Sequence, residues 1–345
     1  MVPKSYVSWL KPFLVLASLF FLGQVTPIYF PVLISTVLAF ILNPLVNYFS
    51  SKQIFRGIAI GRGIAVLLAF LCSGLVVGVI VTFVFLPFIH EFDKFIIDLP
   101  ALIRRVQDIS LKIEERASMM EIPGNVNNLI DQTISSAAAY SADLARRILN
   151  ALLGFATSVV ELVVVPVLTY YFLRDWKILK EKTVGLFAVE NRNQVRKTIE
   201  EMAFVISAYI RGQFLVSVVI GIMVFCGMYL LGVPYPLVLG LLATCTETIP
   251  IIGPIVGAIP AIMLAYLTSP ALAIKVVIFY LIIHQIENHI VVPNIMGHTI
   301  DLHPVIVIIS LLIGGQLLGI VGMMIAVPET AMLRVLIKQL WNIER

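Results

Sequence analysis

Acidic side chains inside apolar stretches are the residues of this sequence best suited to chemistry. Glu247 lies between Thr246 and Thr248 at the end of one apolar run, and Glu287 lies in another, one helical turn after His284. Charged groups within a membrane segment cost about 3 kcal/mol or more, and they usually face a cavity or a partner group. A carboxyl group held there can exchange protons near neutral pH, and a nearby imidazole can share the proton. The pattern predicts a site for a proton, a cation or a polar solute.

Polar side chains gather around Glu287 in the run HQIENH at 284–289. Helical spacing of about 100° per residue puts His284, Glu287 and Asn288 on one stripe of a helix. Tyr280, one turn earlier, lies on the same stripe. The alternative interpretation is structural, because such groups also hydrogen-bond neighbouring helices or reach to the membrane interface. A third acid, Glu161, lies in the middle of a different apolar run and is open to the same two interpretations.

Patterns for metal binding and enzymatic catalysis are weak in this sequence. His298, Asp301 and His303 are close together, but their short loop is bounded by prolines and offers no fourth ligand nearby. His284 and His289 are five residues apart, unlike the i and i+4 histidines of the zinc motif H-E-x-x-H. No nucleophile elbow, P-loop or dinucleotide fingerprint occurs in the sequence. We therefore predict neither an enzyme nor an ATP-driven pump, and no metal or other cofactor.

The composition of the chain places these residues in a membrane. Of the 345 residues, 60% are hydrophobic and 13% are charged, whereas soluble domains carry about 25% charged residues. This excludes an ordinary soluble enzyme, a disordered chain and a disulfide-built secreted module. No block of Lys and Arg suggests binding to nucleic acid. We expect an all-α polytopic membrane protein with about eight hydrophobic segments, each about 20 residues or more.

The hydrophobic segments and the basic residues between them predict the topology. An excess of Lys and Arg marks the cytoplasmic loops, and basic residues cluster at 52–62, at 177–197 and in the C-terminal tail. The turns at 26–31 and 232–236 carry none. We therefore expect a multi-pass membrane protein with both termini in the cytoplasm. The apolar segments are 13–30, 32–49, 64–89, 148–173, 202–231, 237–267, 271–292 and 305–327.

Three regions follow from this pattern. Residues 1–90 form N-terminal transmembrane helices, and residues 151–345 form a C-terminal transmembrane core. Residues 91–150 carry nine acidic and seven basic side chains with apolar residues at helical spacing between them. We expect amphipathic helices there on the outer side, lying on the membrane or on neighbouring subunits. A solvated helical spacer is an equal alternative, because amphipathicity alone does not identify a partner.

The segment 237–267 is too long for one regular span and is interrupted by prolines and glycines. Its two halves, 237–249 and 255–267, have 13 residues each. That length gives about 20 Å of helix, less than the roughly 30 Å of the hydrocarbon core. A re-entrant helical hairpin fits these lengths if its tip is buried in protein or faces water. The predicted tip contains Pro250, Gly253 and Pro254.

A second segment, 305–327, repeats this design. Pro304 and Pro328 are 24 residues apart, as are Pro236 and Pro260. The predicted tip of this segment is Gly314-Gly315-Gln316. A long apolar helix precedes each broken segment, so the arrangement occurs twice. If both segments are re-entrant, they enter from opposite sides as an inverted repeat, in which binding sites form at discontinuous helices. In the alternative, both are kinked spans and the chain crosses the membrane eight times.

The candidate pathway combines the buried acids, their neighbours and the two tips. Glu287 is the predicted proton- or cation-exchanging group, with His284 and Asn288 assisting it. The full set of predicted pathway residues is Glu161, Glu247, Pro250, Gly253, Pro254, His284, Gln285, Glu287, Asn288, Gly314, Gly315 and Gln316.

Several ordered motifs resemble one known family of permeases. YFLRDW (171–176), YIRGQ (209–213), ETIPIIGPIVGAIP (247–260) and HQIENHIVVPNIMG (284–297) are similar to motifs of the autoinducer-2 exporter family of bacteria and archaea. The similarity continues through 302–328 and is most specific over 150–335. The Ile-Pro-x-x-Gly-Pro break of the family corresponds to Ile249, Pro250, Gly253 and Pro254. Glu247, in contrast, occupies a position where many relatives have a neutral residue.

The resemblance implies transport without ATP. Family members are described as exporters of autoinducer-2, a small polar solute, and others as Na⁺(Li⁺)/H⁺ antiporters. It also implies a homo-oligomer, with a pentamer as one expected form, and an elevator-like movement. We therefore expect a secondary transporter of a small polar solute coupled to H⁺ or Na⁺, with the lipid bilayer of a bacterial or archaeal cytoplasmic membrane as its environment. The alternatives are a passive oligomeric channel and a membrane scaffold whose 91–150 segment binds a partner.

Overall fold

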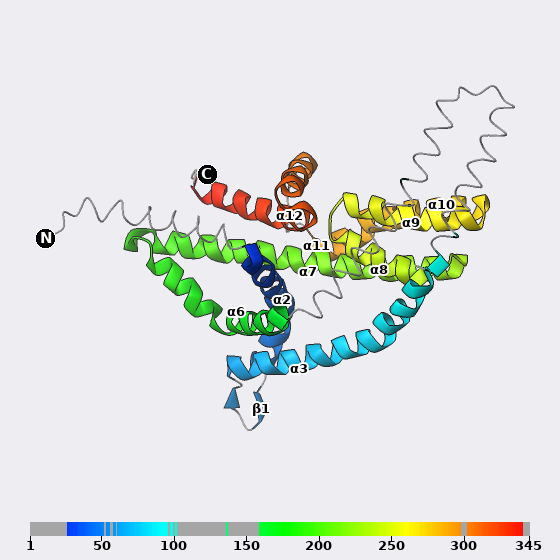
Figure 1. Cartoon of the computed structure of the whole chain (residues 1–345). Helices are drawn as coiled ribbons and strands as arrows, with labels where there is room; N and C mark the ends of the chain where they lie inside the picture. The colour runs from blue at the N-terminus through cyan, green and yellow to red at the C-terminus, as the bar shows by residue number, and fades with distance from the viewer. Residues whose placement is uncertain are drawn as a thin grey trace. The chain divides into compact units, whose positions relative to one another are not determined.

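The computed structural model shows a chain built mainly of long helices (Figure 1). It describes residues 26–51, 53–55, 58–59, 61–95, 97–98, 101, 136, 159–297 and 302–340. Within these residues, five helices are long and apolar enough to cross a membrane, and two apolar helices are shorter. The predicted all-α polytopic fold is therefore confirmed. The only strands in the described residues form a small antiparallel hairpin, β1 (Gln53–Phe55) with β2 (Ile58–Ala59).

Several predictions concern residues outside this described part. They include the first hydrophobic segment, 13–30, nearly all of the 91–150 region, and the loop residues His298 and Asp301. Glu161 belongs to a helix of the structure, but its side chain also lies outside the described residues.

The chain divides into two compact units, and the first comprises residues 1–70 and 154–179. It contains α2 (Thr26–Ser51), the start of α3 (Arg62–Ile80) and most of α6 (Val159–Gly185). Hydrogen bonds join α2 to α6. The Thr169 hydroxyl donates to the Ser35 carbonyl at 3.3 Å, and the Ser35 hydroxyl donates to the Val165 carbonyl at 3.2 Å. Arg62 donates from Nε to the Leu173 carbonyl at 2.6 Å. The apolar core of this unit is Ala39, Val46, Ala65, Val66, Ala69 and Leu173.

The second unit, residues 71–153 and 180–345, contains the candidate site. Its longest straight element is α7 (Arg192–Leu231), whose 40 residues extend about 60 Å at 1.5 Å per residue. The first turns of α7 are polar and pair with the end of α6. Arg196 binds both carboxylate oxygens of Glu181 at 3.0 and 2.8 Å, which holds the pKa of Glu181 below its ordinary value. The remaining two-thirds of α7 is apolar and forms the platform for two helical hairpins.

The first hairpin consists of α8 (Pro236–Glu247) and α9 (Ile252–Thr268). Pro250 lacks an N–H group, so α8 cannot continue through it, and the chain turns back over residues 248–251. Gly253 then packs so closely that a Cβ atom there would collide with the Thr246 carbonyl group. The predicted break in this segment is therefore present, and the helix ends lie within a few residues of the predicted ones.

The start of α8, opposite the tip of this hairpin, is held by the helical stretch that follows the π-helix η1 (Val81–Phe85). Glu91 accepts hydrogen bonds from the Leu237 and Val238 amides at 3.0 and 3.2 Å, which caps the N-terminus of α8. Tyr235 donates to Asp98 at 2.5 Å. Burial, together with this hydrogen bond, raises the pKa of Tyr235 to about 12. Phe88, Phe92 and Phe95 pack in the main core with α7 and the hairpin.

The second hairpin, like the first, is preceded by a long apolar helix, α10 (Pro270–Ile286). This helix begins where the Ser269 hydroxyl accepts from the Leu272 amide at 3.1 Å. It continues without a gap into the π-helix η3 (Glu287–Val291) and then into α11 (Val292–Met296), which ends at Gly297. Single π-turns within helices are often found at functional sites. Here the π-turn begins at Glu287, the residue predicted to exchange the ion.

The second broken segment, α12 (Pro304–Leu340), reverses direction at Gly319, which has φ 62° and ψ −137°. The two arms pack tightly, because a Cβ atom on Gly314 or Gly322 would collide with the carbonyl group of the other glycine. Ser310 and Thr330 hydroxyls also hydrogen-bond at 2.7 Å, although a straight helix would hold them about 30 Å apart. The segment is therefore a hairpin. The prediction that its tip lies at 314–316 is wrong by about one turn, because those glycines pack the arms together and a later glycine makes the turn.

The hairpin form of α12 predicts where its ends lie in the membrane. Its two arms are antiparallel, so His303 and the C-terminal end of α12 should face the same side. The positions of the basic residues in the sequence predict that this side is the cytoplasm. We expect a His303→Cys variant to react with a membrane-impermeant thiol reagent from the cytoplasmic side only, like a Leu186→Cys reference in the exposed connection between α6 and α7. The background chain needs its free cysteines, Cys72, Cys226 and Cys245, replaced. Labelling from the outer side would contradict the re-entrant arrangement and support complete spans.

Candidate ion and solute site

The two acids predicted from the sequence meet in the second unit. Glu247 is the last residue of α8 and is 2% exposed, and Glu287 opens the π-helix and is 7% exposed. Both residues line one small cavity, so their carboxyl groups lie near each other. His284, one turn before Glu287, places Nδ1 3.4 Å from a Glu287 carboxylate oxygen, and half of its side chain is exposed. The structure therefore brings together three of the predicted pathway residues, from two helices that are distant in sequence.

A small cavity lies beside this acid pair, between α7, α8, α9 and α10. Its volume is about 20 Å³, which is space for roughly one water molecule. The Tyr280 hydroxyl donates to the Gly257 carbonyl at 3.3 Å and ties α10 to α9 at the cavity wall. Two predicted tip residues, Gly253 and Pro254, also line it. The full lining is Ile220, Val224, Ala243, Thr246, Glu247, Gly253, Pro254, Gly257, Tyr280, Ile283, His284 and Glu287.

Other predicted residues lie away from this cavity. Gln285 and Asn288 are exposed and do not line it. Gln316 is exposed near the end of the second hairpin, while Gly314 packs its arms together. Gly315 faces Met323 of the opposite arm. The described residues include no group of three or more metal-binding side chains placed to hold a metal ion.

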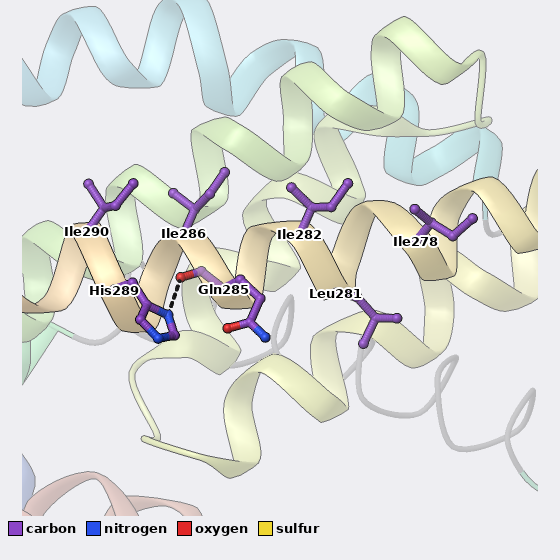
Figure 2. Close-up of a pocket in the computed structure, with 7 residues that line it drawn as sticks. All are labelled: Ile278, Leu281, Ile282, Gln285, Ile286, His289 and Ile290. Carbon is purple, nitrogen blue, oxygen red and sulfur yellow. Dashed lines mark hydrogen bonds between the residues drawn. The ribbon is translucent and has the colours of Figure 1, made fainter.

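An open groove on the outer face of α10 contains Gln285. Figure 2 shows four isoleucines along one side of this helix, with Leu281, Gln285 and His289 along the other. His289 is hydrogen-bonded through Nδ1 to the Gln285 carbonyl at 3.0 Å. The groove has a volume of about 440 Å³ and is lined by residues of this one helix, Ile278, Leu281, Ile282, Gln285, Ile286, His289 and Ile290. It is an exposed apolar helix face and not an enclosed binding pocket.

Gln213 is a site residue that the sequence reasoning did not identify. It lies in the middle of α7, is 8% exposed, and donates from Nε2 to the Glu247 carbonyl at 2.6 Å. That carbonyl stands at the end of α8, where helical partners are missing. Gln213 therefore positions the backbone that carries the Glu247 side chain. The sequence feature that could have identified Gln213 is its single amide side chain in an apolar run, within the motif YIRGQ.

We predict that Gln213→Leu leaves the Glu247 carbonyl buried without a partner. Loss of the bond should lower the free energy of unfolding by about 1–3 kcal/mol and loosen the position of Glu247. Thermal unfolding of the purified protein in detergent measures the first effect. Phe214→Leu is the matched control, because Phe214 is the next residue on the same helix and is exposed. Equal melting temperatures for Gln213→Leu and the control would contradict the role of Gln213.

Long apolar helices, paired helical hairpins and a buried acid pair define a multi-pass membrane transport protein. The chain belongs to the AI-2E transporter family, whose model matches residues 12–342. Several relatives bear the name "Putative transport protein". YrrI of Bacillus subtilis is 28% identical over 309 residues, which is 90% of this chain and 85% of the relative. YueF of the same organism is 27% identical over 325 residues, which is 91% of this chain and 84% of the relative. YhhT of Escherichia coli is 26% identical over 304 residues, which is 88% of this chain and 82% of the relative.

Proposed function

We propose that this protein is a secondary transporter that moves a small polar solute, such as autoinducer-2, out of the cell in exchange for H⁺ or Na⁺. The observation that carries the proposal is that two buried acids, Glu247 and Glu287, line one small cavity inside an apolar helical unit. Family membership supports the transport activity. The names of the relatives specify no solute, so autoinducer-2 comes from the family description alone.

The acid pair is suited to bind a single cation. Two carboxylates in contact repel each other unless a proton or a metal cation lies between them. The neighbouring cavity of about 20 Å³ admits an ion or a water molecule. His284 contacts Glu287 and is half exposed, so it can pass a proton between the pair and the surroundings. Release of the cation on one side and its uptake on the other would couple the gradient to movement of the solute.

The proposal places the protein in the cytoplasmic membrane with both termini in the cytoplasm. Large apolar side chains are exposed along α10 and α12, for example Ile274, Leu281, Leu312 and Leu317. Exposed apolar surface of this extent belongs against lipid or against neighbouring subunits. It therefore supports both the bilayer and a homo-oligomer as the surroundings of the chain, with the pentamer as one candidate form.

A flux assay on purified protein in liposomes tests this function. We expect autoinducer-2 to cross faster than in empty liposomes, and an imposed pH or Na⁺ gradient to increase the rate. Exchange of Na⁺ or Li⁺ for H⁺ without any solute would instead identify a Na⁺(Li⁺)/H⁺ antiporter, which the acid pair also supports. Solute flux that ignores both gradients would indicate a passive channel. The absence of any flux would contradict a transport function for autoinducer-2.

A further inference from the structure

The cavity beside Glu247 and Glu287 has room for an ion but not for a transported solute. Its volume is about 20 Å³, whereas pockets for small molecules are typically about 300 Å³ or larger. If the protein transports a solute as proposed above, that solute must bind at another place. Such a place should carry a polar group that the protein itself leaves without a partner.

Tyr209 carries such a group. Its side chain is 4% exposed, and its hydroxyl has no hydrogen-bond partner in the described part of the chain. Burial of a hydroxyl group without a partner costs about 1–3 kcal/mol, so native proteins seldom leave one unexplained. A bound ligand or water molecule that accepts from this hydroxyl, or donates to it, would remove that cost.

Tyr209 lies where both helical hairpins meet α7. It belongs to a cluster of buried and partly buried side chains, which we call the hairpin junction. It joins α7, the tip of the first hairpin and both arms of the second hairpin. Its members are Tyr209, Ile210, Ile249, Ile252, Leu302, Val307, Leu311, Met323, Ala326 and Val327. Transporters with discontinuous helices commonly bind their substrates near helix breaks, and the junction contains one such break, where Ile249 and Ile252 of the first hairpin pack against the arms of the second.

The first hairpin has a strained backbone next to the junction. Ile251, between the junction residues Ile249 and Ile252, adopts φ 67°. A β-branched residue at positive φ is a true outlier, and strain of this kind costs about 1–3 kcal/mol and is concentrated at ligand clamps and moving parts. The tip of the first hairpin is therefore held in an unfavourable conformation where it contacts the junction.

A direct physical link connects the junction to the acid pair. Gln213 follows Tyr209 by one helical turn on the same face of α7, and it donates to the Glu247 carbonyl at 2.6 Å. A ligand that shifts the first hairpin at the junction would shift Glu247 through this bond. Solute and cation would then occupy separate but adjacent sites on the same hairpin.

We propose that the hairpin junction is the solute-binding site and that the Tyr209 hydroxyl hydrogen-bonds a hydroxyl or carbonyl group of a neutral solute. The inference rests on the proposed transport function and assigns its solute site. A phenol offers one donor and one acceptor without a charge, and the surrounding side chains of the junction are apolar. A small uncharged molecule with hydroxyl or carbonyl groups on one side and carbon on the other fits both features. In the present conformation the second hairpin covers Tyr209, so this hairpin must move to admit the solute.

A Tyr209→Phe variant tests the site because it removes only the hydroxyl group. We expect its melting temperature in detergent to equal or exceed that of the wild-type protein, since the lost group has no partner. In liposomes with autoinducer-2 as the probe, the KM should rise about tenfold, in line with one lost hydrogen bond, while the maximal rate and its dependence on the ion gradient stay unchanged. Tyr229→Phe, an exposed position on the same helix, should leave both KM and stability unchanged.

The possible results separate the site from the function. Wild-type protein that transports autoinducer-2, together with an unchanged KM for Tyr209→Phe, would overturn the site and leave the transport function intact. A lowered melting temperature with an unchanged KM would show a structural role only and would also overturn the site. Failure of the wild-type protein to transport autoinducer-2 would overturn the proposed function and the site assigned to that solute.

Discussion

Glu287→Gln should abolish ion-driven transport while leaving the protein folded. The amide has nearly the same shape as the carboxyl group and can still hydrogen-bond His284 and Glu247, so packing is retained. It cannot ionise, however, so the Glu247 carboxyl group can no longer share a proton or a metal cation with a second carboxylate. Flux driven by a pH or Na⁺ gradient in liposomes should fall to the level of empty liposomes. The melting temperature in detergent should change little.

Controls for this prediction come from the same chain. Glu190→Gln replaces an exposed acid in the short connection between α6 and α7. This variant should leave flux unchanged. Glu247→Gln should reduce gradient-driven flux as strongly as Glu287→Gln, and the double variant should show no further loss, because contacting groups act as one unit. Glu287→Gln protein that retains full gradient-driven flux would exclude this acid from ion coupling.

The acid pair could be anticipated from sequence, but its exact surroundings could not. Glu247 and Glu287 stand out because a carboxyl group in an apolar run is costly, and that cost can be seen without coordinates. Gln213 was missed because its role is to bind the backbone of a residue 34 positions away, and such a contact leaves only a weak trace in the sequence. Tyr209 was missed for a related reason, since a tyrosine in an apolar run looks like an ordinary core residue until its hydroxyl is found unpartnered.

The two hairpins show a different limit of sequence reasoning. In the first, prolines identify the break reliably, because the ring removes a backbone donor and stops the helix. In the second, glycines carry the signal, and a glycine can either turn the chain or let two helices approach closely. Gly314 and Gly322 serve close packing, while Gly319 adopts positive φ and makes the turn. The sequence alone does not assign these two roles among neighbouring glycines, so the predicted tip was misplaced by about one turn.

Gly253→Ala should be among the most destabilising single changes in the second unit, which contains both hairpins. The added Cβ atom would collide with the carbonyl group of Thr246 and lie 2.9 Å from the Glu247 Cα atom. Both neighbours are backbone atoms at the end of α8, so no side-chain rotation can relieve the contact. Overpacking usually costs about 1–3 kcal/mol and occasionally more, and we expect the upper end of this range. Because the displaced backbone carries Glu247, gradient-driven flux should also be lost.

Two other glycines provide graded controls for this prediction. At Gly315 a Cβ atom would approach only the flexible Met323 side chain, at 3.3 Å, and at Gly74 it would meet nothing within 4 Å. Gly315→Ala should therefore have a small effect, and Gly74→Ala should stabilise its helix by up to about 1 kcal/mol. Melting temperatures in detergent should rank Gly74→Ala highest and Gly253→Ala lowest. A Gly253→Ala protein as stable as Gly315→Ala would show that the first hairpin is not packed backbone to backbone at its tip, and Glu247 would then lack the rigid support that ion coupling at the acid pair requires.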